Sequence, residues 1–251
     1  MERWEWLIRP KTGIWQDPAI GCFTEDPIAL AHFARIGKDD AVLDLGTGNG
    51  VMCLYAEALY GGAYTGIDVD ERQIALAKRS AAKNGQPIRF LSMRVEDAPE
   101  ILGHGAFTRI LANPPYFTAG EEGRNAIARH AGSGQLSDWC RAAFLLLKNG
   151  GTLTLCYPAD RLAPLFRALD ENRFAPKRMQ LLMGERGARL VLVEAKKLGG
   201  DGLTVTIVPN RTERKPDAIH AQLFPFTDKP SSREFICTLA IHLRDRIRAG
   251  R

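Results

Sequence analysis

Two short motifs contain residues whose types and spacing could perform chemistry. Residues 44–50 are Asp-Leu-Gly-Thr-Gly-Asn-Gly, and residues 113–116 are Asn-Pro-Pro-Tyr. The first places a carboxylate before three closely spaced glycines, which let a backbone approach a ligand. The second combines an amide, two rigid prolines and an aromatic ring. Together they predict a site that binds a nucleoside cofactor and holds a planar amino group.

The glycine loop differs from the loop that binds dinucleotides. Gly46, Gly48 and Gly50 follow the apolar run 41–45, which is typical of a buried parallel strand. Their spacing is G-x-G-x-G, whereas the pyrophosphate fingerprint is G-x-G-x-x-G. Asp44 suits a cationic ligand, such as the amino and sulfonium groups of S-adenosylmethionine, better than a pyrophosphate. Taken alone, the loop could equally be an ordinary strand-to-helix turn.

Carboxylates stand at the ends of two further predicted strands. Asp68 ends the strand expected over 63–67, where a carboxylate accepts hydrogen bonds from ribose hydroxyls. Asp97 follows the strand expected over 88–93. It could accept the exocyclic amine of adenine or be an ordinary surface carboxylate. With the glycine loop, these residues favour a nucleoside cofactor over a simple turn.

The Asn-Pro-Pro-Tyr motif follows the strand expected over 107–112. Its prolines keep Asn113 out of the helical region and stiffen a loop at the carboxyl end of the sheet, where ligands bind. The Asn113 side-chain oxygen and the Pro114 carbonyl can each accept one N–H of a conjugated amine, which aims its lone pair at a methyl group. Tyr116 can stack on the planar group. A surface turn is the alternative for such a motif standing alone.

The segment after this motif, residues 118–135, contains four glycines. It is either a lid over the target base or a long surface connection. Near its end, Arg129 and His130 could hold a phosphate or the base, or pack against the helix expected over 136–147. The reaction needs no strong base, because the amine becomes acidic only once methylation has begun.

In order and spacing, these motifs resemble those of the Rossmann-like, amino-directed methyltransferases, and more narrowly the bacterial valine-tRNA (adenine-37-N6)-methyltransferases. Ala131 departs from that family, whose members usually have Glu there, and Thr108 stands where many have Asp. These departures leave the amine clamp intact and weaken the inference of an identical nucleic-acid substrate. Four further segments carry the resemblance, which spans residues 15–208: Phe23-Thr24-Glu25-Asp26, Ala128-Arg129-His130, Tyr157 to Leu162 and Pro176-Lys177-Arg178.

The resemblance implies an α/β, Rossmann-like fold with a seven-stranded, mostly parallel sheet, an antiparallel edge strand and helices on both faces. Residues 189–195 and 203–208 would form its closing hairpin. Residues 1–208 would be the S-adenosylmethionine-dependent domain with its N-terminal segment, and 209–251 a linker and a helix docked on it. The implied site comprises Asn113, Pro114, Pro115 and Tyr116 for catalysis, Asp26, Asp44, Gly46, Gly48, Gly50, Asp68 and Asp97 for the cofactor, and Phe117, Arg129 and His130 for the substrate.

Composition is that of a cytoplasmic enzyme with one large core. The chain has 251 residues, of which 45% are hydrophobic. It shows no apolar signal segment at its N-terminus, and no stretch approaches the roughly 18 apolar residues of a membrane span. Its five cysteines include no Cys-x-x-Cys pair, and its histidines lack ligand spacing. We therefore expect no metal, no membrane contact and no obligate protein partner.

The net charge of +5 comes from the C-terminal half. Basic residues there could form part of a phosphate-contacting face or simply a solvated surface. Ser231-Ser232-Arg233-Glu234 is typical of a capping box that opens a helix. The basic residues considered for the face are Arg161, Arg167, Arg173, Lys177, Arg178, Arg186 and Arg189, and the apolar residues of the expected helix are Phe235, Ile236, Leu239, Leu243 and Ile247.

These features predict S-adenosylmethionine-dependent N6-methylation of an adenine in tRNA, with adenine 37 of valine tRNA implied by the resemblance. A protein glutamine N5-methyltransferase would use the same clamp, but that family usually has a helical domain before the cofactor motif. Methylation of an amino group in ribosomal RNA or DNA is another alternative. From a different class, a non-catalytic RNA-binding protein could retain the fold, against which the intact clamp argues.

Overall fold

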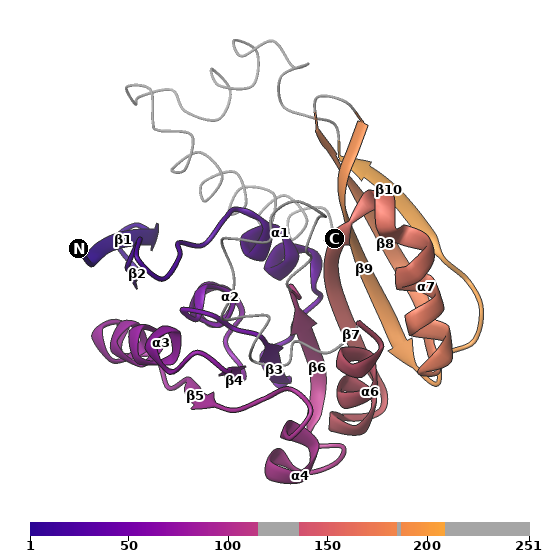
Figure 1. The fold of residues 1–251 in the computed structure, drawn as a ribbon, viewed down its shortest axis with the longest axis horizontal. Helices are drawn as coiled ribbons and strands as arrows, with labels where there is room; N and C mark the ends of the chain where they lie inside the picture. Colours follow the sequence, from indigo (N-terminus) through magenta and orange to yellow (C-terminus); the bar gives the residue numbers. More distant parts are fainter. Residues whose placement is uncertain (115–135, 185–186, 209–251) are drawn as a thin grey trace.

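The centre of the molecule is an eight-stranded sheet with the strand order β10-β8-β9-β7-β6-β3-β4-β5 (Figure 1). The computed structural model describes residues 1–114, 136–184 and 187–208. A separate hairpin, β1–β2, lies at the N-terminus. The strands are β1 (Arg3–Ile8), β2 (Thr12–Gln16), β3 (Ala41–Leu45), β4 (Ala63–Asp68), β5 (Arg89–Ser92), β6 (Phe107–Ala112), β7 (Leu147–Pro158), β8 (Phe174–Gly184), β9 (Gly187–Lys197) and β10 (Thr204–Val208).

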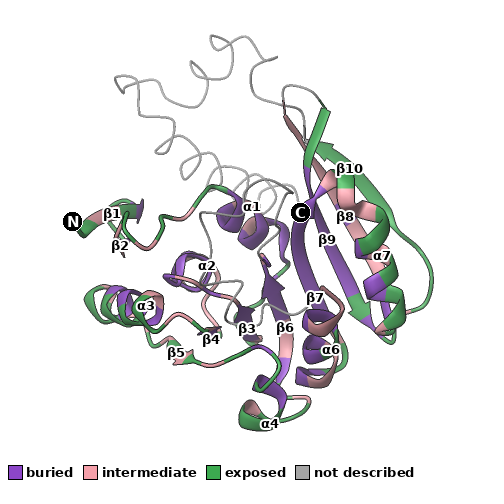
Figure 2. Cartoon of the chain, viewed as in Figure 1, coloured by how far each residue is buried: buried purple, intermediate pink, exposed green. Residues whose placement is uncertain are grey.

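Helices cover both faces of this sheet, and side chains alternate between the faces along each strand. Val42 and Leu111 belong to the core cluster under one helical layer, and Leu43 and Ile110 to the cluster under the other. Figure 2 shows the central strands buried between the layers. No described helix is long and apolar enough to span a membrane. The helices are α1 (Asp26–Phe33), α2 (Val51–Tyr60) and α3 (Glu71–Asn84) on the first face, α4 (Ala98–Leu102), α6 (Leu136–Leu146) and α7 (Leu162–Glu171) on the second, and the 3-10 turn η1 (Ala159–Arg161).

The predicted fold class is confirmed, with two corrections to its sheet. The described residues give the main sheet eight strands rather than seven, and its antiparallel strand, β9, lies between β7 and β8 rather than at an edge. The expected hairpin of 189–195 with 203–208 is wrong, because β9 pairs with β8 and β10 runs parallel to β8. The sequence 176–178, Pro-Lys-Arg, concealed β8, since proline and adjacent charges are unfavourable in a strand interior.

The sequence also gave no indication of the β1–β2 hairpin, which packs along α3. The Trp15 amide donates to the Ser80 hydroxyl over 2.9 Å, and the Gly13 amide donates to the Asn84 side chain over 3.0 Å. The Lys83 ammonium lies 3.9 Å from the centre of the Trp4 ring. Cation–π contacts and hydrogen bonds to side chains of α3 therefore stabilise this hairpin, in which polar and apolar residues do not alternate regularly.

A buried ion pair joins β8, β9 and α1. The Arg178 guanidinium donates to both oxygens of Glu194, over 2.9 and 2.7 Å, and also to the Phe33 carbonyl over 2.7 Å. Both side chains are largely buried, at 18% and 9% exposure. The pair thus attaches the C-terminal end of α1 to β8 and β9, which come much later in the sequence.

We expect Arg178→Met to lower the free energy of unfolding by about 3 kcal/mol, because it strands a buried carboxylate. The double variant Arg178→Met, Glu194→Gln should recover part of that loss, since it removes the stranded charge. Urea unfolding of the four proteins in the double-mutant cycle measures both effects. Equal losses for the single and double variants would contradict this view of the pair.

Candidate active site

The register of three neighbouring strands brings the predicted site residues together. Leu45 of β3 pairs with Ile67 of β4 on one side and with Ala112 of β6 on the other. The next residues along these strands are Gly46, Asp68 and Asn113. Parallel strands lie about 4.8 Å apart, so these three residues are neighbours at the carboxyl end of the sheet. This is the edge at which open α/β sheets bind ligands.

The glycine loop turns tightly over packed aromatic rings. Gly46, Gly48 and Gly50 have φ values of 69°, 55° and 83°, in the left-handed region that favours glycine. A Cβ atom at Gly46 would lie 2.6 Å from the Trp139 ring, and one at Gly50 would lie 2.7 Å from Phe90. A Cβ at Gly48 would meet no atom within 4 Å. The loop is therefore closed underneath and open at Gly48, where a ligand can approach its backbone.

Asp68 holds this loop in place. One carboxylate oxygen accepts the Gly48 amide over 2.8 Å, and the other accepts the Asp70 amide over 2.9 Å. Burial raises the pKa of Asp68, and these hydrogen bonds partly oppose the rise. A carboxylate oxygen can accept more than one hydrogen bond, so Asp68 retains the capacity to accept a ribose hydroxyl. Positioning the glycine loop is a role that the sequence did not reveal.

Asp44 lies beneath the loop and is fully buried. Its Oδ2 accepts a 2.7 Å hydrogen bond from the Thr47 hydroxyl, and its Oδ1 has no partner among the described residues. Burial raises the pKa of Asp44 to about 7; the Thr47 hydrogen bond lowers it and the Asp68 charge raises it. A buried acceptor with an unused oxygen favours the approach of a cation, which would also stabilise its ionised form.

Asn113 and Asn49 present two further unused polar atoms. Asn113 follows β6 directly, and its side-chain Oδ1 is buried without a hydrogen-bond partner in the described part of the chain. The Asn49 side-chain Nδ2, in the glycine loop, is likewise buried and unpartnered there. Buried polar atoms normally find partners, and an exception in a folded protein often marks a ligand site. Asn113 offers an acceptor and Asn49 a donor.

Asp26 closes the site from the N-terminal side. This residue begins α1, is buried, and accepts hydrogen bonds from the Arg189 guanidinium over 2.8 and 3.4 Å. Arg189 precedes Leu190, which pairs with Pro158 at the carboxyl end of β7. Because β9 runs antiparallel, its first residues lie at the same edge as the glycine loop. Asp26 is thus anchored at the site edge by Arg189, an arginine that lies far from it in the sequence.

The other predicted site residues are less constrained. Asp97 is exposed at the start of α4, and its side chain makes no capping hydrogen bond. The connection that leads to it is joined to Asp68, whose carbonyl accepts the Met93 amide over 3.0 Å. Pro114 is buried beside Asn113. The remaining predicted residues, Pro115, Tyr116, Phe117, Arg129 and His130, lie outside the described residues, as do the possible lid 118–135, Arg186 and the expected helix after 231.

Several residues of this site were missed from the sequence. Thr47 was a detectable candidate, because a hydroxyl three residues after a buried carboxylate in a turn can bond back to it. Arg189 was considered only for the phosphate-contacting face, and nothing in the sequence indicated its contact with Asp26, which arises from the antiparallel course of β9. Trp139 and Phe90 looked like core residues, which they are, and only the structure shows that they support the glycine loop.

Comparison with known proteins identifies the same part of the chain. Residues 42–151 match a methyltransferase domain. This stretch contains β3 through the start of β7, and with them the glycine loop, Asp68 and Asn113. S-adenosylmethionine is the cofactor of this domain, as the sequence predicted.

The resemblance to tRNA1(Val) (adenine(37)-N6)-methyltransferases is confirmed by curated relatives. The one from Shewanella amazonensis is 31% identical over 140 residues, which are 54% of this chain and 60% of that protein. Ribosomal protein L11 methyltransferase of Thermus thermophilus is 44% identical over 85 residues, 34% of this chain and 31% of that protein. The solved structure of TrmN from Thermus thermophilus has a TM-score of 0.54 and 30% identity, covering 68% of this chain and 48% of that one. The chain thus spans less than two thirds of each.

The donors and acceptors of the site fit S-adenosylmethionine. The open side of Gly48 lets a ligand lie against the loop. The unpartnered oxygen of Asp44 would be stabilised by a positively charged group of the ligand. Asp68 can accept from a ribose, and the Asn49 amide can donate to a carboxylate. Bound there, the cofactor supplies an electrophilic methyl group on a sulfonium.

Gly50→Ala should lower the free energy of unfolding by about 2–4 kcal/mol, because the cost of a left-handed φ in alanine adds to the cost of a clash with Phe90. Gly48→Ala should cost only about 1 kcal/mol, since it adds strain without a clash. It should nevertheless weaken S-adenosylmethionine binding more than its stability loss explains, because the methyl occupies the open side of the loop. Denaturant unfolding and calorimetric titration separate the two. Unchanged affinity in Gly48→Ala would place the cofactor elsewhere.

Cofactor affinity should rise with pH. Asp44, with a pKa of about 7, is mostly protonated at pH 6 and mostly ionised at pH 8, and the ionised form attracts a cation. We expect about tenfold tighter binding at pH 8 than at pH 6, following the ionised fraction. Asp44→Asn should flatten this rise while the protein remains folded. An identical pH profile in Asp44→Asn would show that Asp44 is not the group whose ionisation governs binding.

Proposed function

We propose that this protein transfers a methyl group from S-adenosylmethionine to the N6 atom of an adenine in tRNA, with adenine 37 of valine tRNA as the target. The observation that carries the proposal is the buried, unpartnered Oδ1 of Asn113 beside the glycine loop. An acceptor held there awaits an N–H donor, and the amine of adenine is one. The relative from Shewanella amazonensis is named for this reaction.

The chemistry needs orientation more than acid or base catalysis. The lone pair of the adenine amine forms a bond to the methyl carbon while the carbon–sulfur bond breaks, and its electrons remain on the sulfur. The nitrogen then loses one proton to water. In this proposal Asn113 accepts one N–H and the Pro114 carbonyl accepts the second, so that the lone pair points along the transfer path. Asp44 and Asp68 hold the glycine loop that positions the donor.

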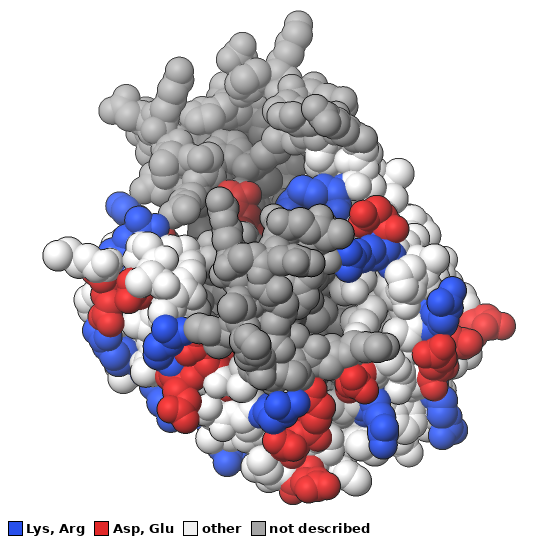
Figure 3. Space-filling model, viewed as in Figure 1, with Lys and Arg blue, Asp and Glu red and all other residues white. Residues whose placement is uncertain are grey.

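The tRNA contact does not require the basic face expected from the sequence. Arg178 pairs with Glu194, and Lys177 is bonded to the Gly200 and Asp201 carbonyls at the opposite edge of the sheet. On the face seen in Figure 3, the described basic and acidic side chains are interspersed. Arg161 and Arg189 do lie at the site edge, after β7 and at the start of β9. These two are therefore the described residues of that set that are best placed to meet a phosphate.

Methylation of a protein amino group is the second candidate, because the L11 methyltransferase relative has the higher identity. Its match covers only about a third of this chain. The tRNA1(Val) relative matches a longer stretch. Identity confined to a short segment reflects a shared cofactor half more than a shared substrate, so the tRNA proposal has the wider support.

The test is transfer of labelled methyl from S-adenosylmethionine to unmodified tRNA, with nucleoside mass spectrometry of the product. N6-methyladenosine is expected. Asn113→Ala should lower kcat/KM by about 10²–10³, because it removes an acceptor used at the transition state. Its cofactor affinity, measured by calorimetry, should stay within about twofold. Asn113→Asp keeps an acceptor and should retain more activity than Asn113→Ala.

Two outcomes would overturn parts of this proposal. Label in ribosomal RNA, DNA or protein, with none in tRNA, would keep the site and replace the substrate. Loss of cofactor binding in Asn113→Ala would instead mean that Asn113 holds the donor and not the amine.

A further inference from the structure

The described helices leave one face of the sheet incompletely covered at its outermost strand. In β10, Val205 pairs with Met179 of β8, and Ile207 pairs with Leu181. Paired residues of parallel strands point to the same face, so Val205 and Ile207 extend the apolar surface that includes Met179. Yet they are 49% and 62% exposed, while Met179 is 8% exposed. Figure 2 shows this margin of the sheet as exposed.

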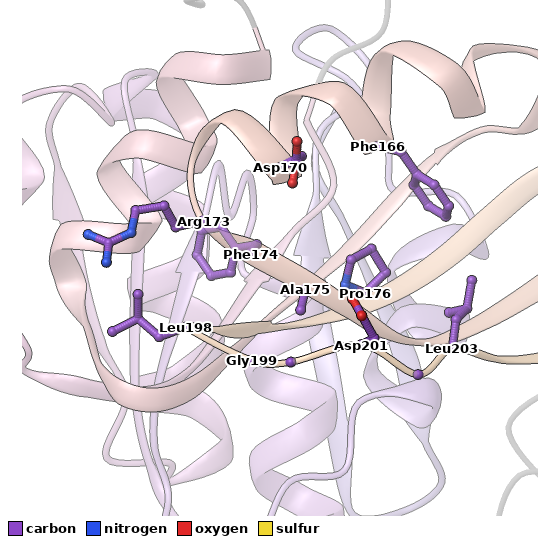
Figure 4. Close-up of a pocket in the computed structure, with 12 residues that line it drawn as sticks. Phe166, Asp170, Arg173, Phe174, Ala175, Pro176, Leu198, Gly199, Asp201 and Leu203 are labelled. Atoms are coloured by element: carbon purple, nitrogen blue, oxygen red, sulfur yellow. The ribbon is translucent and has the colours of Figure 1, made fainter.

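Helix α7 stops one strand short of covering this surface. Among the described elements, α7 packs on β7 and β8, and β10 has extensive contacts with β8 alone. An open groove of about 620 Å³ lies beside α7, at the sheet edge opposite the candidate active site. Figure 4 shows Phe166 of α7 on one side of it and Leu203, which precedes β10, on the other, with Pro176 of β8 between them. The groove adjoins the exposed side of β10 at Leu203, and Asp170, Arg173 and Asp201 lie among its apolar residues; the groove and the exposed side of β10 are together called the strip.

The chain itself continues directly from this strip. β10 ends at Val208, and residues 209–251 follow. The sequence predicts a helix from the capping box at 231–234 onward, with apolar residues on one side. A helix over 231–247 would be about 25 Å long, enough to span a strand of this length with its groove. The preceding segment 209–230 can reach back over the sheet, since an extended chain spans up to about 3.3 Å per residue.

We propose that residues 231–247 dock on the strip formed by β10, β8 and the outer side of α7. Strand β10 runs toward the active-site edge, so a chain returning from Val208 meets the strip from that end and finishes at the groove. There the basic end of the segment, Arg244 to Arg248, meets Asp170 and Asp201, which line the groove. Arg173 also lines the groove and lies over the Phe144 ring.

This docking would complete the helical layer on that face. Its apolar surface would then be buried along its whole width, as the central strands already are. It would also shield the outer edge of β10, which otherwise offers unpaired backbone groups to another strand. The proposal is independent of the substrate, because the strip lies away from the glycine loop and Asn113.

Hydrogen–deuterium exchange on the full chain tests it. In the wild-type protein, backbone amides of 203–208 should be protected, and Leu239→Asp should speed their exchange by about tenfold or more, because it places a carboxylate in the apolar contact. Thr238→Asp is the matched control: it adds the same charge to the neighbouring residue, outside the apolar set, and should leave exchange within about twofold. Peptides over β3 and β4 should be unchanged in both variants, which establishes that the core is folded.

A reciprocal variant keeps the test decisive. Ile207→Asp alters an exposed side chain of the strip and should speed exchange in peptides from 231–247. Equal exchange of 203–208 in wild type and Leu239→Asp would overturn the proposal. Protection that depends on protein concentration would assign the strip to a second copy, and protection that appears only when tRNA is added would assign it to RNA; either result also overturns it.

Discussion

The site depends on the register of β3 with its two neighbours. Leu45 lies between Ile67 and Ala112, so the residues that leave these three strands are side by side: a glycine, a carboxylate and an amide. A slip of one residue in either ladder would move Asp68 or Asn113 to the other face of the sheet. Both faces are apolar and buried, which makes such a slip costly. The hydrophobic core therefore determines which polar residues lie side by side at this edge of the sheet.

Within that edge, the glycine loop is held from below and left open above. Trp139 and Phe90 leave no room for a side chain at Gly46 or Gly50, and Asp68 bonds the Gly48 amide. Beneath the loop, Asp44 raises the energy of the site, because a buried carboxylate with an unused oxygen is poorly solvated. A cationic ligand relieves that cost. We therefore expect the same burial that destabilises Asp44 to favour a positively charged ligand at the site.

The sequence predicted the parts of this structure that local patterns encode. Apolar runs ending in glycine, Asp68 or Asn113 identified β3, β4 and β6 and their order, because strand and turn chemistry are local. It did not predict β8, whose proline and charges conceal a strand that is stabilised by Glu194 and β10. It also missed the Asp26–Arg189 contact. Pairings of that kind depend on the direction of a distant strand, which no local pattern specifies.

The contacts that the sequence did not predict involve residues outside the methyltransferase domain. Residues 42–151 match the methyltransferase domain, and the chain has curated relatives named for RNA and for protein methylation. Asp26 precedes that domain and Arg189 follows it, yet they meet at the site edge. Segments on both sides of residues 42–151 therefore reach the edge of the candidate site. We expect the selection of one substrate to depend on such segments outside the domain, because relatives named for different substrates resemble this chain.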